Sequence, residues 1–425
     1  MSNRIPEISD ELYKIDDALR AGFGWELGPF ETWDALGVAA TAAAMKEAGF
    51  APAPWIDEML ASGAESFYKA EGGRRLYYSI PDKAYKPIPG TESFIILDNF
   101  RGDTPVWSNT GATIHDLGDG VLNLEFHTKM NAIGAEIIEG VHKVMDMAEE
   151  SYTGVVVGND AQNFSAGANL MMMLMLAIEQ EFDELDLAIR TFQNTVTRLR
   201  FSSVPTVVAP HGLTLGGGCE MTMHADKAVA AAETYIGLVE VGAGLIPAGG
   251  GTKEFAVRAA DAYRAGDVEL NILQDKLLTI AQAKVATSGH EAYNIGVLRP
   301  DWDRVVTNQD RLLAEAKKEV LKMADAGYVK PTMRNDIKVL GQSALGSFYV
   351  AIDSMQRANY ISEHDALIAR KLAYVITGGD LSSPQKVSEQ YLLDLEREAF
   401  LSLLGEKKTL ERIQHILQTG KPLRN

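Results

Sequence analysis

Cysteine is nearly absent from this 425-residue chain, and long apolar runs are missing altogether. The single Cys219 excludes an internal disulfide, and a lone thiol favours a reducing compartment. No apolar run approaches the ~18 residues that a membrane-spanning helix needs. The N-terminal segment MSNRIPEISDELYK is polar and has no apolar signal core. We therefore expect a cytoplasmic globular protein with no membrane partner.

Positive charge is also in deficit. The chain has 40 lysine and arginine residues against 58 acidic residues, so its formal net charge is -18. A negative field repels phosphate backbones, which argues against nucleic acid as a partner. An anionic ligand would have to be held by local donors such as backbone amides or a few lysines. Hydrophobic residues make up 46% of the chain, enough for the cores of two or three domains.

Several common catalytic motifs are missing. The eight histidines form no HExxH pattern, and Glu220 with His224 is a lone pair at four-residue spacing, so no metal site is expected. The run GLIPAGGGTK is not a P-loop because its threonine precedes its lysine. No GxSxG nucleophile elbow occurs, since FSAG lacks the first glycine.

The hydrophobic pattern predicts alternating strands and helices in the middle of the chain. Helical spacing dominates residues 8–70, and residues 72–110 look like turns and short extended pieces. From residue 113 onward strands alternate with helices, which implies crossover connections and an α/β core. The first expected elements are a hairpin in TIHDLGDGVLNLEFH, a helix over 133–150, a strand over 154–158 and one long helix from about 170 to 200. The strand VPTVVAP, a short helix after a Gly-rich turn and the strand KAVAAA are expected next. From residue 253 the pattern predicts an almost wholly helical remainder.

Three consecutive glycines precede Cys219 and Glu220 in the segment HGLTLGGGCEMTM. Glycines let the backbone pass close to a ligand and leave an amide free to donate a hydrogen bond. A helix that starts directly afterwards points its positive end at the same place, where an oxyanion would be stabilised. A tight turn beneath a helix would explain the glycines equally well.

A second Gly-rich segment, GLVEVGAGLIPAGGGT, carries Glu240. A carboxylate among glycines and apolar residues is partly desolvated, which raises its pKa and suits general acid–base work. Two such carboxylates facing one cavity, Glu220 and Glu240, could hold a water molecule between them. For either glutamate taken alone, a capping or solvated role is the more common one. A third segment, FSAGANL, has small residues that leave an amide unobstructed, and Asn169 can cap the helix that follows.

Taken together, these three segments resemble the crotonase superfamily, the enoyl-CoA hydratases and isomerases. The family's order of an AGAD-like loop, GGGCE, a PE-like segment and GxIPGAGGT is met here with matching spacing. The resemblance covers roughly residues 113–300 and includes KMNAI and IAQAKVATSGHEAYNIGVL. It implies an α/β fold with a crotonase-type ββα-superhelix core, flanked here by helical N- and C-terminal regions.

The resemblance also implies roles for individual residues. Ala168 and Gly217 match the two positions whose amides form the family's oxyanion hole. Glu220 and Glu240 match the catalytic glutamate pair of the hydratases. Lys129 lies in the segment that runs along the CoA, although a merely solvated lysine fits there equally well. Further positions of the same motifs are expected to contact the substrate: Ala166, Gly167, Gly216 and Leu170.

Two positions depart from the family pattern. Asn169 replaces the usual aspartate, and Val239 stands where a proline is common before the second glutamate. Neither change removes a catalytic group. The stretch LMMMLML, Leu170–Leu176, could line the acyl chain, since methionines adapt to variable shapes. A buried core helix is the interpretation we favour for that stretch.

The N-terminal region carries a second resemblance. IDDALRAGFGWELGPFETWDALG is similar to the C-terminal helical domain of 3-hydroxyacyl-CoA dehydrogenases, which bacterial fusion proteins join to a crotonase domain in this order. The closing segment also resembles the tail of such fusions. No GxGxxG follows an N-terminal strand, so we expect a truncated fusion that lacks the NAD domain and has no NAD-dependent dehydrogenase activity.

The sequence thus predicts an enoyl-CoA hydratase of fatty-acid β-oxidation, acting on an acyl-CoA thioester with no cofactor beyond the coenzyme A of its substrate. A double-bond isomerase on the same site is one alternative, and a non-catalytic acyl-CoA-binding subunit is another. A homo-oligomer is expected, with a thiolase or dehydrogenase as a further partner. The predicted division is a dehydrogenase-like helical remnant over 1–110, the crotonase-like domain over 111–300 and a helical region over 301–425.

Overall fold

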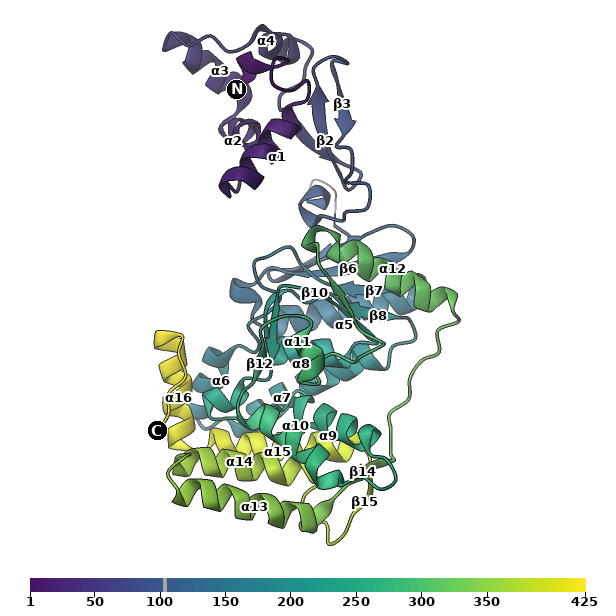
Figure 1. Ribbon diagram of the computed structural model, residues 1–425, viewed down its shortest axis with the longest axis vertical. Helices are drawn as coiled ribbons and strands as arrows, with labels where there is room; N and C mark the ends of the chain where they lie inside the picture. Colours follow the sequence, from purple (N-terminus) through teal and green to yellow (C-terminus); the bar gives the residue numbers. More distant parts are fainter. Residues whose placement is uncertain (102–104) are drawn as a thin grey trace. The chain divides into compact units, whose positions relative to one another are not determined.

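The computed structural model describes residues 1–101 and 105–425. The chain divides into two compact units, Met1–Pro105 and Val106–Asn425 (Figure 1). Residues 301–425 belong to the second unit, together with the crotonase-like segment. The domain limits at residues 110 and 300 stay predictions.

The first unit packs four helices around a small antiparallel sheet of order β1-β2-β3. Its core includes Leu12, Phe30 and Phe67, which are almost fully buried. Strands β2 and β3 lie where the sequence predicted only turns and short extended pieces, whereas most of β1 lies at the end of the segment predicted as helical. Tyr77 and Tyr78 of the central strand are buried. The elements are α1 (Leu12–Phe23), α2 (Pro29–Leu36), α3 (Val38–Glu47), α4 (Pro54–Ala61), β1 (Tyr68–Glu71), β2 (Arg74–Ser79) and β3 (Ala84–Pro87).

The second unit is built on a seven-stranded sheet of order β13-β10-β8-β7-β6-β5-β4. The strands from β6 to β13 are parallel, and β4 and β5 extend the sheet in antiparallel fashion. The predicted hairpin is confirmed, because Ala112 pairs with Phe126 and Asp116 with Leu122. The strands are β4 (Trp107–Ser108), β5 (Ala112–Asp116), β6 (Val121–Phe126), β7 (Gly154–Val157), β8 (Thr206–Val208), β10 (Lys227–Ala231) and β13 (Arg304–Val306).

A second, smaller sheet positions the two Gly-rich turns. The chain passes from β8 to β9 (Gly212–Leu215) and from β10 to β11 (Thr234–Gly237), so it alternates between the two sheets. Strands β9 and β11 are parallel, and their last residues, Leu215 and Gly237, pair with each other. The two turns that follow them therefore start side by side. The third strand of this sheet is β12 (Val285–Ala286).

Helices cover both faces of the main sheet. The strand β7 is buried throughout: Val155 and Val157 pack in one cluster with α5 (Ala135–Ser151). Successive side chains of a strand point to opposite faces. An added Cβ at Gly154 would meet Val320, on α12 (Leu312–Asp325), so α12 covers the other face.

One predicted helix is in fact two. The pattern from 170 to 200 predicted a single long helix, whereas the structure has α6 (Leu170–Ile178) and α7 (Phe182–Arg200). Gln180 between them has φ 61°, the left-handed region that ends a helix. Asp183 and Glu184 then lie in the first turn of α7, where negative charge favours a new helix start.

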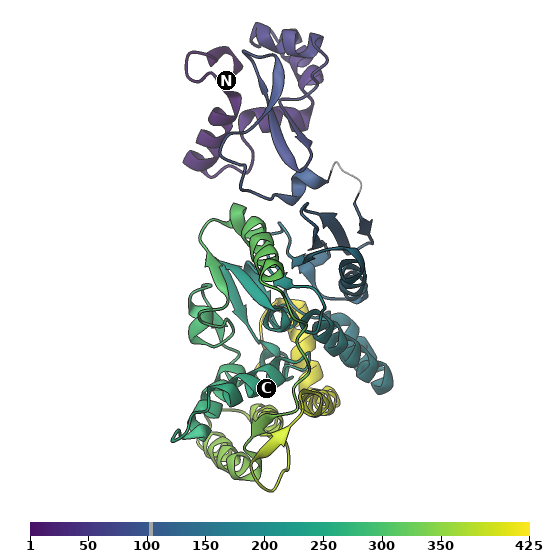
Figure 2. The ribbon, with the colours of Figure 1, turned by 90° about the vertical axis from the view of Figure 1, so that its right-hand side faces the viewer.

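Helices α9, α10, α13, α14 and α15 gather at one end of the second unit, drawn lowest in Figure 1 and Figure 2. There α15 packs against α7 and α9, while α14 packs against α9, α10 and α13. Short strands interrupt the region predicted as almost wholly helical, including the antiparallel pair β14 (Ile337–Val339) and β15 (Gln385–Val387). None of the helices in the described part of the chain is long and apolar enough to cross a membrane. The remaining helices of the unit are α8 (Gly217–His224), α9 (Gly251–Ala262), α10 (Glu269–Ala281), α11 (Glu291–Asn294), α13 (Gly341–Arg357), α14 (Glu363–Ile376), α15 (Glu389–Leu404) and α16 (Lys407–Thr419).

Candidate active site

Glu220 is buried at the middle of α8, with only 3% of its surface exposed. Gly216 precedes the helix with φ 52°, a conformation that suits glycine and turns the chain sharply from β9 into α8. The carboxylate oxygen Oε1 of Glu220 accepts hydrogen bonds from the amides of Gly249 and Gly251, at 2.8 and 2.9 Å. The predicted catalytic glutamate is therefore held by the second Gly-rich segment.

The glycines 249–251 leave no room for side chains. An added Cβ at Gly249 would lie 2.5 Å from Oε2 of Glu220, and one at Gly251 would lie 2.9 Å from Oε1. At Gly250 a Cβ would lie 2.5 Å from the ring of His224. All three distances are shorter than an ordinary carbon contact. The backbone of this turn thus packs directly on Glu220 and on the histidine one helical turn further along α8.

Glu240 begins the short helix η4 (Glu240–Ala243), three residues after β11 ends. An added Cβ on Gly216 would lie 3.1 Å from Oε1 of Glu240, so the second glutamate lies against the turn that leads into α8. Its other oxygen, Oε2, is buried and has no hydrogen-bond partner among the described residues. Glu240 therefore lies against the turn from which the Glu220 helix starts, whereas the Glu220 carboxylate itself lies against Gly249 and Gly251.

Both carboxyl groups bind a proton more tightly than a solvated glutamate does. Burial raises the pKa of Glu220 to about 7, against the opposing influence of the Gly251 and Gly249 amides and of Lys253. Burial also raises the pKa of Glu240 well above its usual value, and the negative charge of Glu220 raises it further. Loss of one proton from the pair is therefore favoured over loss of both. A singly protonated pair suits a base and an acid acting in one site.

The loop that carries Ala168 lies next to the start of α8. An added Cβ on Gly167, whose φ is 96°, would lie 3.3 Å from the amide nitrogen of Gly217. Ser165 bonds the loop to β9, because its amide donates to Leu213 and its carbonyl accepts from Leu215. The amide of Gly217 is in the first turn of a helix, where it has no acceptor within the helix.

Of the predicted oxyanion positions, the loop with Ala168 thus lies beside Gly217, the first residue of α8. The structure places Ala166 in the same loop, where its amide donates to the carbonyl of Met130 at 3.1 Å. Lys129 belongs to η3 (Lys129–Asn131), the segment that this bond joins to the loop, and its side chain is exposed. A role for Lys129 in holding the nucleotide end of CoA stays a prediction.

Leu170 opens α6 directly after this loop and is partly buried. Asn169 caps the helix as predicted, accepting a hydrogen bond from the amide of Met172 at 3.2 Å. The buried-helix interpretation of the methionine stretch is wrong for Met171 and Met175, which are 51% and 55% exposed. Only one stripe of α6 faces the core, because the helix lies at the edge of the unit and packs against α7 and α16.

Phe192, on α7, lies between the two Gly-rich segments and was not found from the sequence. An added Cβ on Gly217 would lie 3.2 Å from Cζ of Phe192, and one on Gly249 would collide with the same ring. The ring therefore packs against both Gly217 and Gly249, next to the glycine whose amide donates to Glu220. Its helical spacing gave no signal, since a core aromatic residue has the same pattern.

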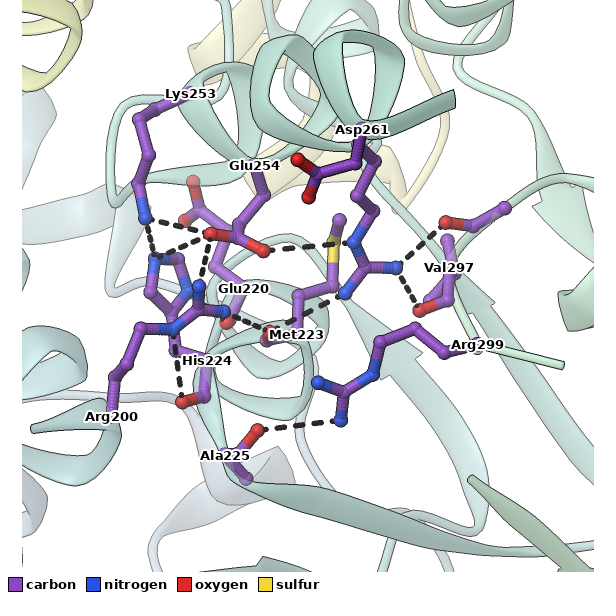
Figure 3. A network of polar contacts seen from close by, with 12 residues as sticks. Arg200, Glu220, Met223, His224, Ala225, Lys253, Glu254, Asp261, Val297 and Arg299 are labelled. Carbon is purple, nitrogen blue, oxygen red and sulfur yellow. Dashed lines mark hydrogen bonds and ion pairs between the residues drawn. The ribbon is translucent and has the colours of Figure 1, made fainter. Parts of the chain in front are cut away.

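A buried ionic network lies behind Glu220 (Figure 3). The Nδ1–H of His224 donates to the carbonyl oxygen of Glu220 at 2.7 Å, and Nε2 accepts from Nζ of Lys253 at 3.0 Å. Burial lowers the pKa of His224 well below its usual value, and the charge of Lys253 lowers it further, so the ring is neutral. Lys253 and Arg200 pair with Glu254 at 2.7 and 2.8 Å.

The network joins His224 of α8 to Lys253 and Glu254 of α9 and to Arg200 of α7. Burial opposes ionisation of Glu254, but the charges of Arg200 and Lys253 lower its pKa well below the usual value. In the described part of the chain no group of three or more histidine, cysteine, aspartate or glutamate side chains is arranged to hold a metal ion. His224 and Glu220, one turn apart on α8, are joined by the hydrogen bond from the His224 ring to the Glu220 carbonyl oxygen.

Comparison with known proteins relates one segment of the chain to a family and the whole chain to longer proteins. Residues 116–273 match the family described as enoyl-CoA hydratase/isomerase, and this range includes every predicted site residue. The chain is 44% identical over 420 residues to a "Probable 3-hydroxyacyl-CoA dehydrogenase" of Bacillus subtilis, which covers 99% of this chain and 52% of that protein. It is 24% identical over 429 residues to a "Putative fatty acid oxidation complex trifunctional enzyme" of Rickettsia felis, covering 98% of this chain and 51% of that protein.

The chain therefore spans about half the length of the curated relatives that it matches. Among solved structures, it is similar to an enoyl-CoA hydratase from Bacillus halodurans. The two are 17% identical with a TM-score of 0.48, and the match covers 71% of this chain and 98% of that one.

Proposed function

We propose that the segment matching the enoyl-CoA hydratase/isomerase family, residues 116–273, hydrates 2-enoyl-CoA thioesters to 3-hydroxyacyl-CoA. The observation that carries the proposal is a pair of carboxyl groups, that of Glu220 buried on α8 and that of Glu240 against the Gly216 turn that leads into α8. Burial raises the pKa of both groups above that of a solvated glutamate, and the negative charge of Glu220 raises the pKa of Glu240 further. Hydration needs one ionised and one protonated group, and these two glutamates supply them.

The chemistry follows from these protonation states. The Glu220 carboxylate takes a proton from water as the water oxygen bonds to Cβ of the substrate. The electron pair of the double bond shifts toward the thioester oxygen, which accepts hydrogen bonds from the amides of Gly217 and Ala168. Glu240 then gives its proton to Cα, and the carbonyl re-forms. Exchange with solvent returns the proton from Glu220 and restores the one on Glu240, so no resident metal or cofactor is needed.

We further propose a role in fatty-acid oxidation, which is supported by the names of the relatives in Bacillus subtilis and Rickettsia felis. The acyl-CoA thioester is the proposed substrate class. Assembly into a homo-oligomer, or with a thiolase or dehydrogenase, stays a prediction.

The decisive experiment uses crotonyl-CoA in water enriched in a heavy oxygen isotope. Loss of the conjugated enoyl absorbance, with one heavy oxygen in the product, is the expected result. A parallel reaction with a 3-enoyl-CoA tests the isomerase alternative, since that activity would create the conjugated absorbance without taking up oxygen. If only the 3-enoyl thioester were turned over, the proposed function would be isomerisation instead of hydration. If both thioesters bound without turnover, the proposed function would be that of a non-catalytic acyl-CoA-binding subunit.

A further inference from the structure

A third buried carboxyl group approaches the catalytic pair from outside the segment that matches the family. Glu396 lies on α15, far beyond residue 273, and its surface is 0% exposed. Its Oε2 accepts a hydrogen bond from the backbone amide of Lys253 at 3.0 Å. Its Oε1 accepts one from Nε2 of Gln193, on α7, at 3.3 Å. A glutamate is rarely buried so completely unless its partners are specific.

The partners of Glu396 are the neighbours of Glu220. The amides of Gly249 and Gly251 donate to Glu220, and the amide of Lys253, two residues further on, donates to Glu396. One short stretch of backbone therefore divides its amides between two buried carboxyl groups. A shift of this stretch toward or away from α15 would change both hydrogen bonds to Glu220.

Gln193 fixes the other side of the same stretch. Its Nε2 donates to the carbonyl of Ala248, directly before the glycines, and to the carbonyl of Leu393 on α15, both at 2.9 Å. Nη1 of Arg397 donates to the amide oxygen of Gln193 at 3.2 Å. Glu396 and Gln193 thus hold the glycine turn against α15 at both ends.

We propose that Glu396 is a positioning residue for the hydration reaction, which holds the Gly249–Lys253 turn so that its amides stay directed at Glu220. The proposal rests on the function proposed above. It assigns to the C-terminal helical layer a part in catalysis, through the backbone of the turn.

The charge balance of the site favours a neutral Glu396. Burial raises its pKa well above the usual value, and the negative charge of Glu220 raises it further, while the amide and the charge of Lys253 lower it. Glu396 therefore binds a proton more readily than a solvated glutamate does. The titratable and charged groups that face Glu396 or its partners are Glu220 and His224 on α8, Glu240 on η4, Lys253 and Glu254 on α9, Arg200 and Asp186 on α7, and Glu389 and Arg397 on α15.

The test compares Glu396→Gln with Glu396→Leu in the full chain. Glutamine is neutral and keeps an acceptor for the amide of Lys253, whereas leucine fills the space and leaves that amide unpaired. Glu398 is exposed on the same helix, so Glu398→Gln and Glu398→Leu are the matched controls. For each variant we would measure kcat and KM for crotonyl-CoA across pH, together with the thermal unfolding midpoint.

We expect Glu396→Gln to keep kcat within about fivefold of the unchanged protein, and Glu396→Leu to lose about tenfold or more with little change in KM. In the leucine variant the acid limb of the pH profile should also move to higher pH, because weaker amide donation to Glu220 favours its protonated form. A purely structural role would lower the unfolding midpoint of Glu396→Leu but leave the acid limb where it is. That result would overturn the proposal, as would equal losses from the glutamine and leucine variants.

A second readout separates this proposal from the hydration proposal. The infrared carboxyl band that disappears in Glu220→Gln reports the protonation of Glu220 directly, without any substrate. Its titration midpoint should rise in Glu396→Leu and stay in place in Glu396→Gln and in both Glu398 variants. If the unchanged protein failed to hydrate crotonyl-CoA and this shift still occurred, only the assigned reaction would be wrong. If the infrared titration midpoint of Glu220 did not change in Glu396→Leu, the positioning role would be refuted even if the protein were an active hydratase.

Discussion

The backbone of Gly249 both holds Glu220 and crowds it. Its amide donates to Oε1 of Glu220 at 2.8 Å, while an added Cβ at the same glycine would lie 2.5 Å from Oε2. The backbone amide of Gly249 can donate to the carboxylate at this distance because glycine has no side chain to collide with it.

Gly249→Ala should therefore damage the site specifically. The new methyl group would push on Oε2 of Glu220 and on the ring of Phe192, since the backbone at Gly249 is not in the left-handed region. We expect kcat to fall by about 10- to 100-fold and stability to fall by about 1–3 kcal/mol from overpacking. The measurements are steady-state kinetics with crotonyl-CoA and thermal unfolding.

Gly242→Ala is the matched control, because an added Cβ there meets only Pro422, at an ordinary 3.5 Å. It should retain nearly full activity. If the two alanine variants behaved alike, crowding of Glu220 by the glycine turn would not be the cause.

Replacing either glutamate should stop the reaction while sparing binding. Glu220→Gln removes the base and Glu240→Gln removes the acid, and each should reduce kcat by roughly 10²–10⁴. The amides of Gly217 and Ala168 are untouched, so CoA-ester affinity should change little. Stopped-flow turnover and calorimetric titration with a non-reactive acyl-CoA measure the two effects. Rates within a few-fold of the unchanged protein for both variants would refute the acid–base pair.

The acid limb of the pH profile of kcat/KM should report the protonation of Glu220. With a Glu220 pKa of about 7, kcat/KM should fall below pH 7, because the protonated base cannot accept a proton from water. Phe192→Ala admits water beside Glu220, which relieves part of the burial that raises its pKa, so the acid limb should move to lower pH. Phe192→Leu keeps the position apolar and is the control. An acid limb that does not move in Phe192→Ala would show that the ring does not shield Glu220.

Much of this site could be predicted because its motifs are local. The glycines before Cys219, the capping Asn169 and the hairpin before the core are all short-range patterns, and the structure has them at the expected places. Glu220 and Glu240 could be paired only through the family resemblance. The physical reason for their proximity, the parallel pairing of Leu215 with Gly237, is a long-range register that no local pattern reveals.

Other features depend on tertiary packing that the sequence does not display. Phe192 and Glu396 lie on amphipathic helices, where one looks like a core residue and the other like a solvated charge. The break at Gln180 was hidden because a continuous helical pattern runs through it, whereas its backbone has φ 61°. Burial of a charged residue depends on contacts between distant segments, and spacing alone gave no sign of it.

The oxyanion hole makes a separate prediction, because its donors are backbone amides. Gly217→Pro removes the amide hydrogen and also crowds Phe192, whereas Cys219→Ala leaves both the amide and the turn in place. The proline variant should lose at least ~100-fold in kcat, and the alanine variant should change it only a few-fold. Circular dichroism must show that both variants are folded. Mild and equal effects would place the thioester carbonyl elsewhere.

Glu220 should also reduce the stability of the protein at the pH where it works. Its pKa is about 7 in the folded protein and close to 4.5 when solvated, so the folded state binds the proton more tightly. Folding is not affected by this group below pH 4.5, where it is protonated in both states. As the pH rises from 4.5 to 7, ionisation favours the unfolded chain. The resulting loss of folding free energy levels off above pH 7 at no more than about 3 kcal/mol.

Glu220→Gln removes this loss of stability, because glutamine can still accept hydrogen bonds from the amides of Gly249 and Gly251. The variant should therefore unfold at a higher temperature than the unchanged protein at pH 8, by about 5 °C, and the difference should shrink toward pH 5. The exposed Glu150 offers the control Glu150→Gln, which should show no such pH-dependent gain. A constant difference between pH 5 and pH 8 would mean that Glu220 is not held in the folded protein with a raised pKa.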